Sequence, residues 1–502
     1  MSIEHVAPRS NREKAPETRY DPCRLGTEPF EITRLHHTPP PDWSVESWKS
    51  RLHAQQVLYP DRAAVDAAVA RLRELPPLVT SWEIEKLKKA IAEAQRGERF
   101  LLQGGDCAEQ IDDCRPESIT AKLKILLQMS VVLIYASKKP VVRVGRFAGQ
   151  YAKPRSSATE MRVVGGKDVA LPSYYGDLVN RPEFDADARR PDPRRMVEGY
   201  THAALTLNFI RALIDGGFAD LHHPEYWDLG FMKHAGLPED LRAEYARMTE
   251  RLAEGLKFME AIGEKSVDQL TRVEFFTSHE GLNLLYESAQ TRTVPRRKGH
   301  YNLSTHLPWI GDRTRALDGA HIEYFRGIRN PVGVKLGANT NPADVPALLR
   351  VLNPSREEGK MVLIVRAGVA KVRGLLPRLI EAVQKAEDAG PVLWMCDPMH
   401  GNTVSAPSGI KTRSFAHILE ELEVSWDVHQ SAGTRLGGVH IELTGEDVTE
   451  CVGGAAGLTE DDLTRRYLSP CDPRLNYEQA LELAFCLARR MAGGAATGAA
   501  AK

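Results

Sequence analysis

The stretch "MVLIVRAG" (361–368), with "LLPRLIEAVQKAEDAG" (375–390) and "PVLWMC" (391–396) after it, indicates the fold of this chain. Two short and almost continuous apolar runs flank a segment whose apolar residues recur at helical spacing. Apolar runs of this kind are typical of parallel strands that are buried on both faces, and a helix usually connects such strands. The three pieces therefore predict one β-α-β unit.

The same pattern recurs along the chain, where apolar runs end in glycine or in a charged cluster and amphipathic segments follow. Eight such strands predict an α/β fold, a closed (β/α)8 TIM barrel rather than an open sheet. The runs are "RFLLQGG" (99–105), "PVVRVG" (140–145), "VEFFTSHE" (273–280), "HLPWIG" (306–311), "PVGVKLG" (331–337), "MVLIVRAG" (361–368), "PVLWMC" (391–396) and "GVHIEL" (438–443).

About 125 residues separate the second and third runs, and this is too long for one crossover. We expect a helical insertion after the second strand, at about 157–270, with a clear helical pattern at 192–217 and a candidate further strand at 219–227. The remaining expectations are a flexible leader (1–42), an N-terminal helical extension (43–98), a catalytic barrel (99–492), and a flexible tail (493–502) after a helix that ends near Arg490.

Composition limits the class of protein. The chain has 502 residues, 42% of them hydrophobic, and a formal net charge of -1, so it can bury a large core and lacks the basic excess of a nucleic-acid-binding protein. Its most apolar stretch, "ILLQMSVVLIYA" (125–136), is shorter than the roughly 20 residues that span a membrane. The N-terminus does not resemble a secretory signal, and seven scattered cysteines suit a reducing cytoplasm.

Four side chains of metal-ligand type are predicted to meet at one end of the barrel, where the carboxyl ends of the strands converge. They are Cys107, His400, Glu442 and Asp472. Each alone is more often structural, as a buried thiol or a solvated carboxylate. Together they supply a thiolate, an imidazole and two carboxylates, a mixture that favours Mn, Co, Zn or Fe over Mg or Ca.

Basic side chains form a second set at strand ends. Arginine forks and lysine ammonium groups that point inward hold phosphate oxygens, and two clusters of them predict two phosphorylated substrates. The sequence has no Walker A loop, no G-x-G-x-x-G motif after a strand and no G-x-S-x-G elbow, which argues against ATP, NAD and serine-hydrolase chemistry. The basic set consists of Arg146, Lys153, Arg155 (with Ser156), Arg313, Lys335 and Arg366.

Many blocks of the sequence, in order over residues 43–492, resemble the type II 3-deoxy-D-arabino-heptulosonate 7-phosphate (DAHP) synthases. The resemblance implies a metal-dependent condensation of phosphoenolpyruvate with erythrose 4-phosphate, the first step of the shikimate pathway, for aromatic amino acids or secondary metabolites. The blocks are "FLLQGGDCAE", "RFAGQYAKPRS", "TSHEGLNLLYE", "WIGDRTRALDGAH", "NPVGVKLG", "CDPMHGNT", "GGVHIELTGEDVTECVGG" and "CDPRLNYEQALELAF".

The resemblance also implies roles for the two sets. The four ligand-type residues named above would hold the metal. Arg146, Arg313, Lys335 and Arg366 would bind phosphoenolpyruvate, and Lys153, Arg155 and Ser156 would bind the phosphate end of the sugar. Asp312, beside Arg313 and with Lys335, is our candidate for orienting the attacking water and moving its proton.

Three other readings stay open. A relative that uses an imino sugar phosphate to make an amino-DAHP product would keep the metal and phosphoenolpyruvate residues but alter "KPRS" and "GDRTR", which are intact here. A Schiff-base aldolase with Lys335 as nucleophile would leave the metal-type residues without a role. A non-catalytic barrel that regulates chorismate mutase should have lost some of these residues.

Two further expectations concern assembly and redox state. By the resemblance we expect a homo-oligomer and an association with chorismate mutase, a partner known in this family. Cys471 immediately precedes Asp472, so its thiol should lie near that of Cys107. A disulfide between the two would consume the thiolate ligand and silence the enzyme, unless Cys471 is merely a packed apolar residue.

Overall fold

The computed structural model describes residues 42–216 and 273–499 and the single residues 239, 243, 247 and 250; beyond residue 492 it describes the backbone alone. The chain divides into two units, Met1–His36 and His37–Lys502, and the fold given below is that of the second. The expected leader up to residue 41, the candidate strand at 219–227 and most of 217–270 lie outside the described residues.

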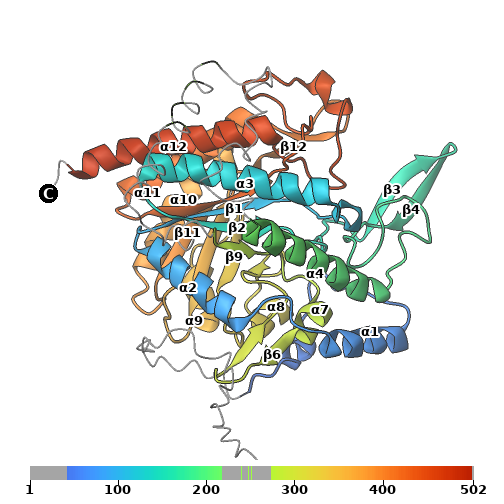
Figure 1. The fold of residues 1–502 in the computed structure, drawn as a ribbon. Coiled ribbons are helices and arrows are strands. Elements are labelled where there is room, and N and C mark those ends of the chain that lie inside the picture. Colours follow the sequence, from blue (N-terminus) through green and yellow to red (C-terminus); the bar gives the residue numbers. More distant parts are fainter. Residues whose placement is uncertain are drawn as a thin grey trace, which may run out of the picture. The chain divides into compact units, whose positions relative to one another are not determined.

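One parallel sheet of eight strands forms the centre of the fold (Figure 1), in the order β5-β2-β1-β14-β11-β10-β9-β8. Each of the eight predicted runs overlaps one of these strands, so the strand predictions are confirmed. The strands are β1 (Phe100–Gly105), β2 (Val141–Arg146), β5 (Phe275–Thr277), β8 (Trp309–Ile310), β9 (Val332–Gly337), β10 (Met361–Arg366), β11 (Val392–Cys396) and β14 (Leu436–Glu442).

The sheet is curled, and its two end strands approach each other. The backbone N–H of Trp309 in β8 donates to the carbonyl of His279, just beyond β5, over 3.1 Å, and the N–H of Gly281 donates to the carbonyl of Trp309 over 3.0 Å. An α/β fold with eight parallel strands in a curled sheet is consistent with a TIM-like architecture.

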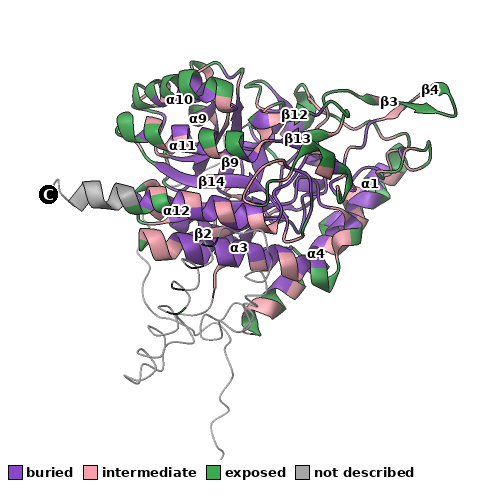
Figure 2. Ribbon diagram, turned by 90° about the horizontal axis from the view of Figure 1, so that it is seen from above, coloured by how far each residue is buried: buried purple, intermediate pink, exposed green. Residues whose placement is uncertain are grey.

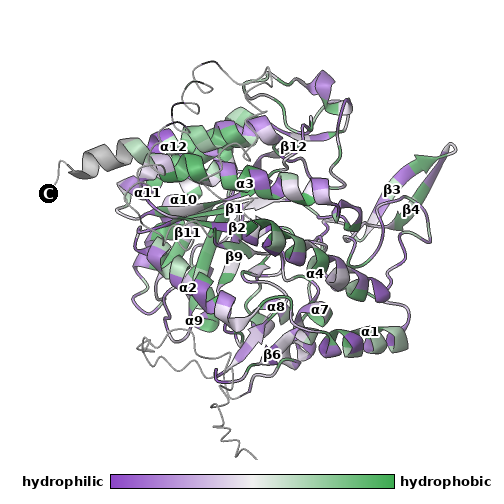
Figure 3. Cartoon of the chain, in the orientation of Figure 1, coloured by the Kyte–Doolittle hydropathy of each residue, from purple (hydrophilic) through white to green (hydrophobic). Residues whose placement is uncertain are grey.

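Both faces of the strands are buried, which explains their nearly unbroken apolar sequences (Figures 2 and 3). Alternate residues such as Leu101 and Ile364 form one core cluster, to which helix α2 (Ser81–Gln95) adds Leu87 and Ile91. The intervening residues, such as Leu363, belong to outer clusters shared with the surrounding helices. The period of two along each strand therefore separates the interior of the curled sheet from its outer layer.

Helix α10 (Val369–Gln384) illustrates why the connecting segments are helical. Its buried residues recur every three or four positions and so make one apolar stripe that packs in the same cluster as β10. They are Val372, Leu375, Leu376, Leu379 and Ile380. The other helices that pack on the outer clusters of the sheet are α3 (Pro116–Ser137), α8 (Ala320–Phe325), α9 (Asp344–Leu352), α11 (Phe415–Ser431) and α12 (Tyr477–Ala499).

Helix α3 contains the stretch that looked too short to span a membrane. At 22 residues it is long and apolar enough to do so, the one such helix in the described part of the chain, but 67% of its apolar window is buried. It lies beside α12 (Figures 1 and 2) and shares a core cluster with it. Its apolar surface is therefore used inside the protein.

The C-terminal end of α12 differs from the prediction. The helix was expected to end near Arg490, but its backbone remains helical to Ala499, within the expected flexible tail. The alanines of "MAGGAATGAA" (491–500) have the highest helix propensity of all residues, which favours a helix here despite the three glycines of the stretch.

The insertion after β2 begins with strands rather than with the expected helix. Strands β3 (Thr159–Val164) and β4 (Lys167–Pro172) pair antiparallel and extend away from the sheet (Figure 1). Gly165 and Gly166 connect them with positive φ angles of 58° and 78°, which suit a two-residue hairpin turn. Helix α4 (Arg194–Asp215) then covers most of the 192–217 segment.

Shorter elements lie before, between and after the main strands and helices. They are η1 (Ser47–Ser50), α1 (Arg62–Glu74), η2 (Ile111–Asp113), α7 (Leu284–Ala289), β6 (Thr291–Thr293), β7 (His300–Asn302), η4 (His400–Asn402), β12 (Thr403–Ser405), β13 (Lys411–Arg413) and η5 (Glu460–Thr464).

Truncation of Leu126, which is fully buried where α3 meets the sheet, should destabilise the protein strongly. Leu126→Ala should lower the free energy of unfolding by about 2–5 kcal/mol, because the lost side chain leaves a cavity. Urea denaturation followed by circular dichroism measures this. Leu205→Ala on α4, where the side chain is 55% exposed, is the control and should change the value by no more than about 0.5 kcal/mol. Equal effects would contradict the core assignment.

Candidate active site

The predicted site residues gather at the carboxyl ends of the strands. Arg146 and Arg366 end β2 and β10, Lys335 lies near the end of β9, and Glu442 ends β14. In the sheet register Gly105 pairs with both Arg146 and Glu442, so β1, β2 and β14 end at the same level. Along each strand, these residues lie an even number of positions from residues that face the interior of the curled sheet. Their side chains therefore also point inward, at the open end that we call the mouth of the sheet.

Glu442 contacts three side chains at the mouth of the sheet. Its carboxylate accepts hydrogen bonds from Arg146 Nη2 at 3.0 Å and Arg413 Nη1 at 2.6 Å, and His400 Nε2 lies 2.9 Å from Oε1. Burial alone would raise the pKa of Glu442, but His400, Arg413 and Arg146 hold this pKa well below its usual value. Glu442 is therefore a buried anion at pH 7.

Cys107 and Asp472 complete the predicted ligand set. One donor atom each from Cys107, Glu442 and Asp472 lie within 4.8 Å of one another, and His400 reaches the same group through Glu442. Lys153 Nζ donates to Cys107 Sγ at 2.8 Å and to Asp472 Oδ2 at 2.7 Å. The four predicted ligands are thus together, and a lysine predicted for the sugar phosphate lies against two of them.

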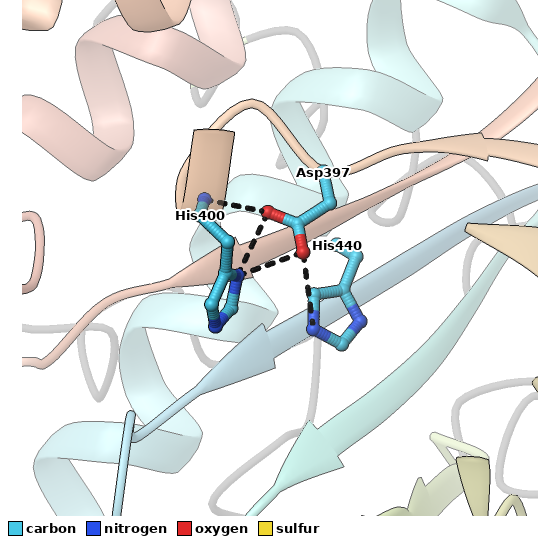
Figure 4. Close-up of side chains that lie close together, drawn as sticks. All are labelled: Asp397, His400 and His440. Carbon is cyan, nitrogen blue, oxygen red and sulfur yellow. Dashed lines mark hydrogen bonds and ion pairs between the residues drawn. The ribbon is translucent and has the colours of Figure 1, made fainter. Parts of the chain in front are cut away.

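A second group that could hold a metal ion consists of Asp397, His400 and His440 (Figure 4). Asp397 Oδ2 lies 2.8 Å from His400 Nδ1 and 4.0 Å from His440 Nε2. Asp397 contacts the Nδ1 atom of His400, so the Nε2 atom is the one that contacts Glu442. Lys335 Nζ donates to Asp397 Oδ2 at 3.0 Å, which brings its charge beside this second group.

The basic residues predicted for phosphoenolpyruvate lie around these groups. Arg146 Nη1 is 2.8 Å from His440 Nε2, and Arg366 Nη1 donates to Asp312 Oδ2 at 3.2 Å. The Nε atoms of both arginines are buried and have no partner among the described residues, so each arginine keeps hydrogen-bonding capacity for an anion. Burial lowers the pKa of Lys335 to about 8, although Asp397 raises it.

Arg313 connects the residues predicted to bind the sugar phosphate with those predicted to bind phosphoenolpyruvate. Arg313 Nη2 donates to Ser156 Oγ at 2.8 Å, which joins the two predicted substrate sets. The backbone N–H of Arg155 donates to Gln55 Oε1 at 2.7 Å, and its Nη1 lies 3.6 Å from Cys471 Sγ. Both carboxylate oxygens of Asp312 accept hydrogen bonds. Oδ2 accepts from Arg366, as described above, and Oδ1 accepts from Arg315 Nε and from the backbone N–H of Gly337.

The two cysteines of the expected redox pair are both free and buried, and they belong to one small cluster. The neighbouring thiol of Cys107, together with Lys153 and Arg155, lowers the pKa of Cys471, whereas burial raises the pKa of Cys107.

Several residues at the mouth of the sheet were not predicted from the sequence. His440 lies two positions before Glu442 on β14, and Asp397 directly follows β11, so strand period and strand-end position could have identified both. Glu280 is buried near Lys335, Lys153 and Arg146, its Oε1 has no hydrogen-bond partner in the described part of the chain, and burial raises its pKa. Arg413, which donates a hydrogen bond to Glu442, follows no predicted strand, and no sequence pattern marked it as a site residue.

The fold and the site define an α/β barrel-type enzyme whose mouth combines metal-type ligands with buried cations. The model of the class-II DAHP synthetase family matches residues 43–488, and the chain belongs to this family.

Three related proteins are each named phospho-2-dehydro-3-deoxyheptonate aldolase. The relative from Neurospora crassa is 49% identical over 462 residues, covering 89% of this chain and 94% of the relative. Those from Streptomyces coelicolor and Mycolicibacterium smegmatis are 48% and 44% identical, covering 88% and 86% of this chain and 96% and 91% of their own lengths. A solved structure of the Francisella tularensis enzyme of that name aligns with a TM-score of 0.46 at 15% identity, over 87% of this chain and 97% of its own.

Proposed function

We propose that this enzyme is a 3-deoxy-7-phosphoheptulonate synthase of the shikimate pathway, which condenses phosphoenolpyruvate with erythrose 4-phosphate and water to give DAHP and phosphate. The names of the relatives support this activity. The main observation that supports this activity is that the ligand-type residues lie beside Arg146, Lys335 and Arg366 at the mouth of the sheet. The catalytic unit would be a closed (β/α)8 barrel (99–492) with the N-terminal extension (43–98) and the insertion after its second strand.

Cys107, His400, Glu442 and Asp472 would hold the divalent metal. The donor set fits such an ion, because its residues are buried or half-buried, lie close together and combine sulfur, nitrogen and carboxylate oxygen. The mixed set favours manganese or cobalt, or zinc or iron, over magnesium. When bound, the metal would supply Lewis acidity that polarises the aldehyde oxygen of the sugar phosphate.

Arg146, Arg313, Lys335 and Arg366 would bind phosphoenolpyruvate. The unpartnered Nε atoms of Arg146 and Arg366 support this role, since both are buried donors that an anion would satisfy. Asp397 and Asp312 would fix Lys335 and Arg366, respectively, by the ion pairs described above. The four cations together offset the charge of a phosphate and a carboxylate.

Lys153, Arg155 and Ser156 would bind the phosphate of the sugar. In the reaction, C3 of phosphoenolpyruvate attacks the aldehyde carbon, water adds to C2, and phosphate leaves by C–O cleavage. Asp312 remains our candidate for orienting this water, with Arg313 and Lys335. Its contacts with Arg315 and Arg366 would hold its carboxylate in one orientation.

Cytoplasmic location, a homo-oligomer and an association with chorismate mutase are also part of the proposal. The intact sugar-phosphate block favours erythrose 4-phosphate over an imino sugar, as does the contact of Ser156 with Arg313. The ion pair of Lys335 with Asp397 gives this lysine a role as a fixed cation rather than as a Schiff-base nucleophile.

Phosphate release from phosphoenolpyruvate should require both erythrose 4-phosphate and a divalent metal. The purified protein should release phosphate and form DAHP when both substrates are present, and lose at least about 90% of this rate after chelation, because the metal activates the aldehyde. Manganese or cobalt should restore the rate. Release that is independent of the sugar phosphate, or full activity in the metal-stripped protein, would contradict the proposal.

Replacement of Lys335 should impair turnover but not metal content. Lys335→Met should lower kcat at least about 100-fold, because developing charge loses a buried cation, while the bound metal measured by mass spectrometry stays near one ion per chain. Lys360→Met is the matched control: Lys360 is also buried, but among the described residues it donates only to the carbonyls of Ile328 and Asn330. The control should lower stability and leave kcat unchanged. A change confined to the KM of the sugar phosphate would contradict the role of Lys335.

Aerobic metal-free protein should form a Cys107–Cys471 disulfide that blocks metal binding, because the crosslink removes the thiolate ligand. Peptide mass spectrometry should detect the crosslink, and a reductant should restore activity at least about tenfold. Cys471→Ser should stay active in air, whereas Cys114→Ser, the control at a half-buried cysteine, should behave as wild type. Inactive oxidised protein without this crosslink would refute the redox pair.

A further inference from the structure

The loop that carries Asp472 has no regular secondary structure to fix it. Residues 467–476 contain neither helix nor strand, and they lie between η5 and α12. Asp472 nevertheless reaches the same small group as Cys107 and Glu442, with donor atoms within 4.8 Å. Backbone hydrogen bonds of Leu475 with Glu442 and Thr444 hold the C-terminal end of this loop, and side-chain interactions hold the part that contains Asp472.

Glu450 makes several of these side-chain interactions. It is fully buried, and its carboxylate accepts three backbone N–H groups of the loop: Leu468 at 3.1 Å, Ser469 at 2.8 Å and Arg474 at 2.7 Å. Two of these donors precede Asp472 and one follows it. A single carboxylate thus fixes both ends of the turn on which Asp472 lies.

Arg474 extends the same contact to the loop that carries Cys107. Its Nε and Nη2 atoms donate to Glu450 at 3.1 and 2.9 Å, and its Nη1 atom donates to Asp106 at 2.8 Å. Asp106 is fully buried, directly precedes Cys107, and also pairs with Lys122 of α3 at 2.6 Å. Glu450, Arg474, Asp106 and Lys122 form a buried chain of two anions and two cations, so its formal charge is zero.

We propose that Glu450 is a positioning residue that, through Arg474, holds Asp472 and Cys107 at the spacing that the metal requires. The inference rests on the proposed function, which makes those two residues ligands. Residues that hold metal ligands by hydrogen bonds set the orientation of those ligands, and their loss typically lowers metal affinity 10–100-fold. Loss of one member of the buried chain would also leave a charged partner unpaired.

The test is Glu450→Gln, which keeps the size of the side chain but removes its charge and one of its acceptor oxygens. Isothermal titration of the full-length metal-free protein with Co²⁺ should give a Kd about 10–100-fold higher than in the wild type. The Co²⁺–thiolate charge-transfer absorption, which reports bonding to Cys107, should weaken. Glu287→Gln is the matched control, since Glu287 is a buried carboxylate that accepts from Asn302 and Ser304 and touches neither loop. It should lose stability but keep Kd and absorption.

A second variant keeps the inference testable if Glu450→Gln does not fold. Arg474→Lys retains the charge but replaces the planar fork, which donates twice to Glu450 and at the same time to Asp106, with a single ammonium group, so Kd should again rise at least about tenfold. Wild-type Kd and thiolate absorption in either folded variant would overturn the inference. A wild type that shows the thiolate band but makes no DAHP would overturn the proposed function alone, and a wild type without the band would overturn the inference together with the assignment of Cys107 as a ligand.

Discussion

The buried carboxylate of Glu442 is the interaction on which the mouth of the sheet depends. It is fully buried and shared by Arg146, Arg413 and His400, which come from β2, β13 and η4. An isolated carboxylate in such a place would be strongly unfavourable, so each partner is needed to keep it charged. In return, the carboxylate fixes three side chains from separate parts of the chain around one point.

The parallel register of the sheet makes this gathering possible. Strands β1 and β14 are neighbours although they lie at opposite ends of the barrel sequence, and Gly105 pairs with Glu442. Cys107 and Asp472, which are 365 positions apart, therefore extend from adjacent places at the mouth. The ion chain through Arg474 and Asp106 then joins their two loops directly. The site is thus assembled where the first and last strands meet.

The eight strands were predictable because burial on both faces leaves a continuous apolar run, and the strand ends located Cys107, Arg146, His400 and Glu442. The β3–β4 hairpin was missed, since its half-exposed strands lack such a run, although the Gly165–Gly166 pair is a turn signal. Glu450 was missed for a different reason. Its importance lies in contacts with residues distant in sequence, and a carboxylate alone gives no sign of those partners.

The most direct test of this account is to locate the metal by anomalous diffraction from crystals grown with Mn²⁺. The account predicts one strong anomalous peak per chain, bonded to Cys107 Sγ, His400 Nε2 and the carboxylates of Glu442 and Asp472, with Lys153 Nζ displaced from Cys107 and Asp472. A peak between Asp397 and His440, or no peak at saturating metal, would contradict it.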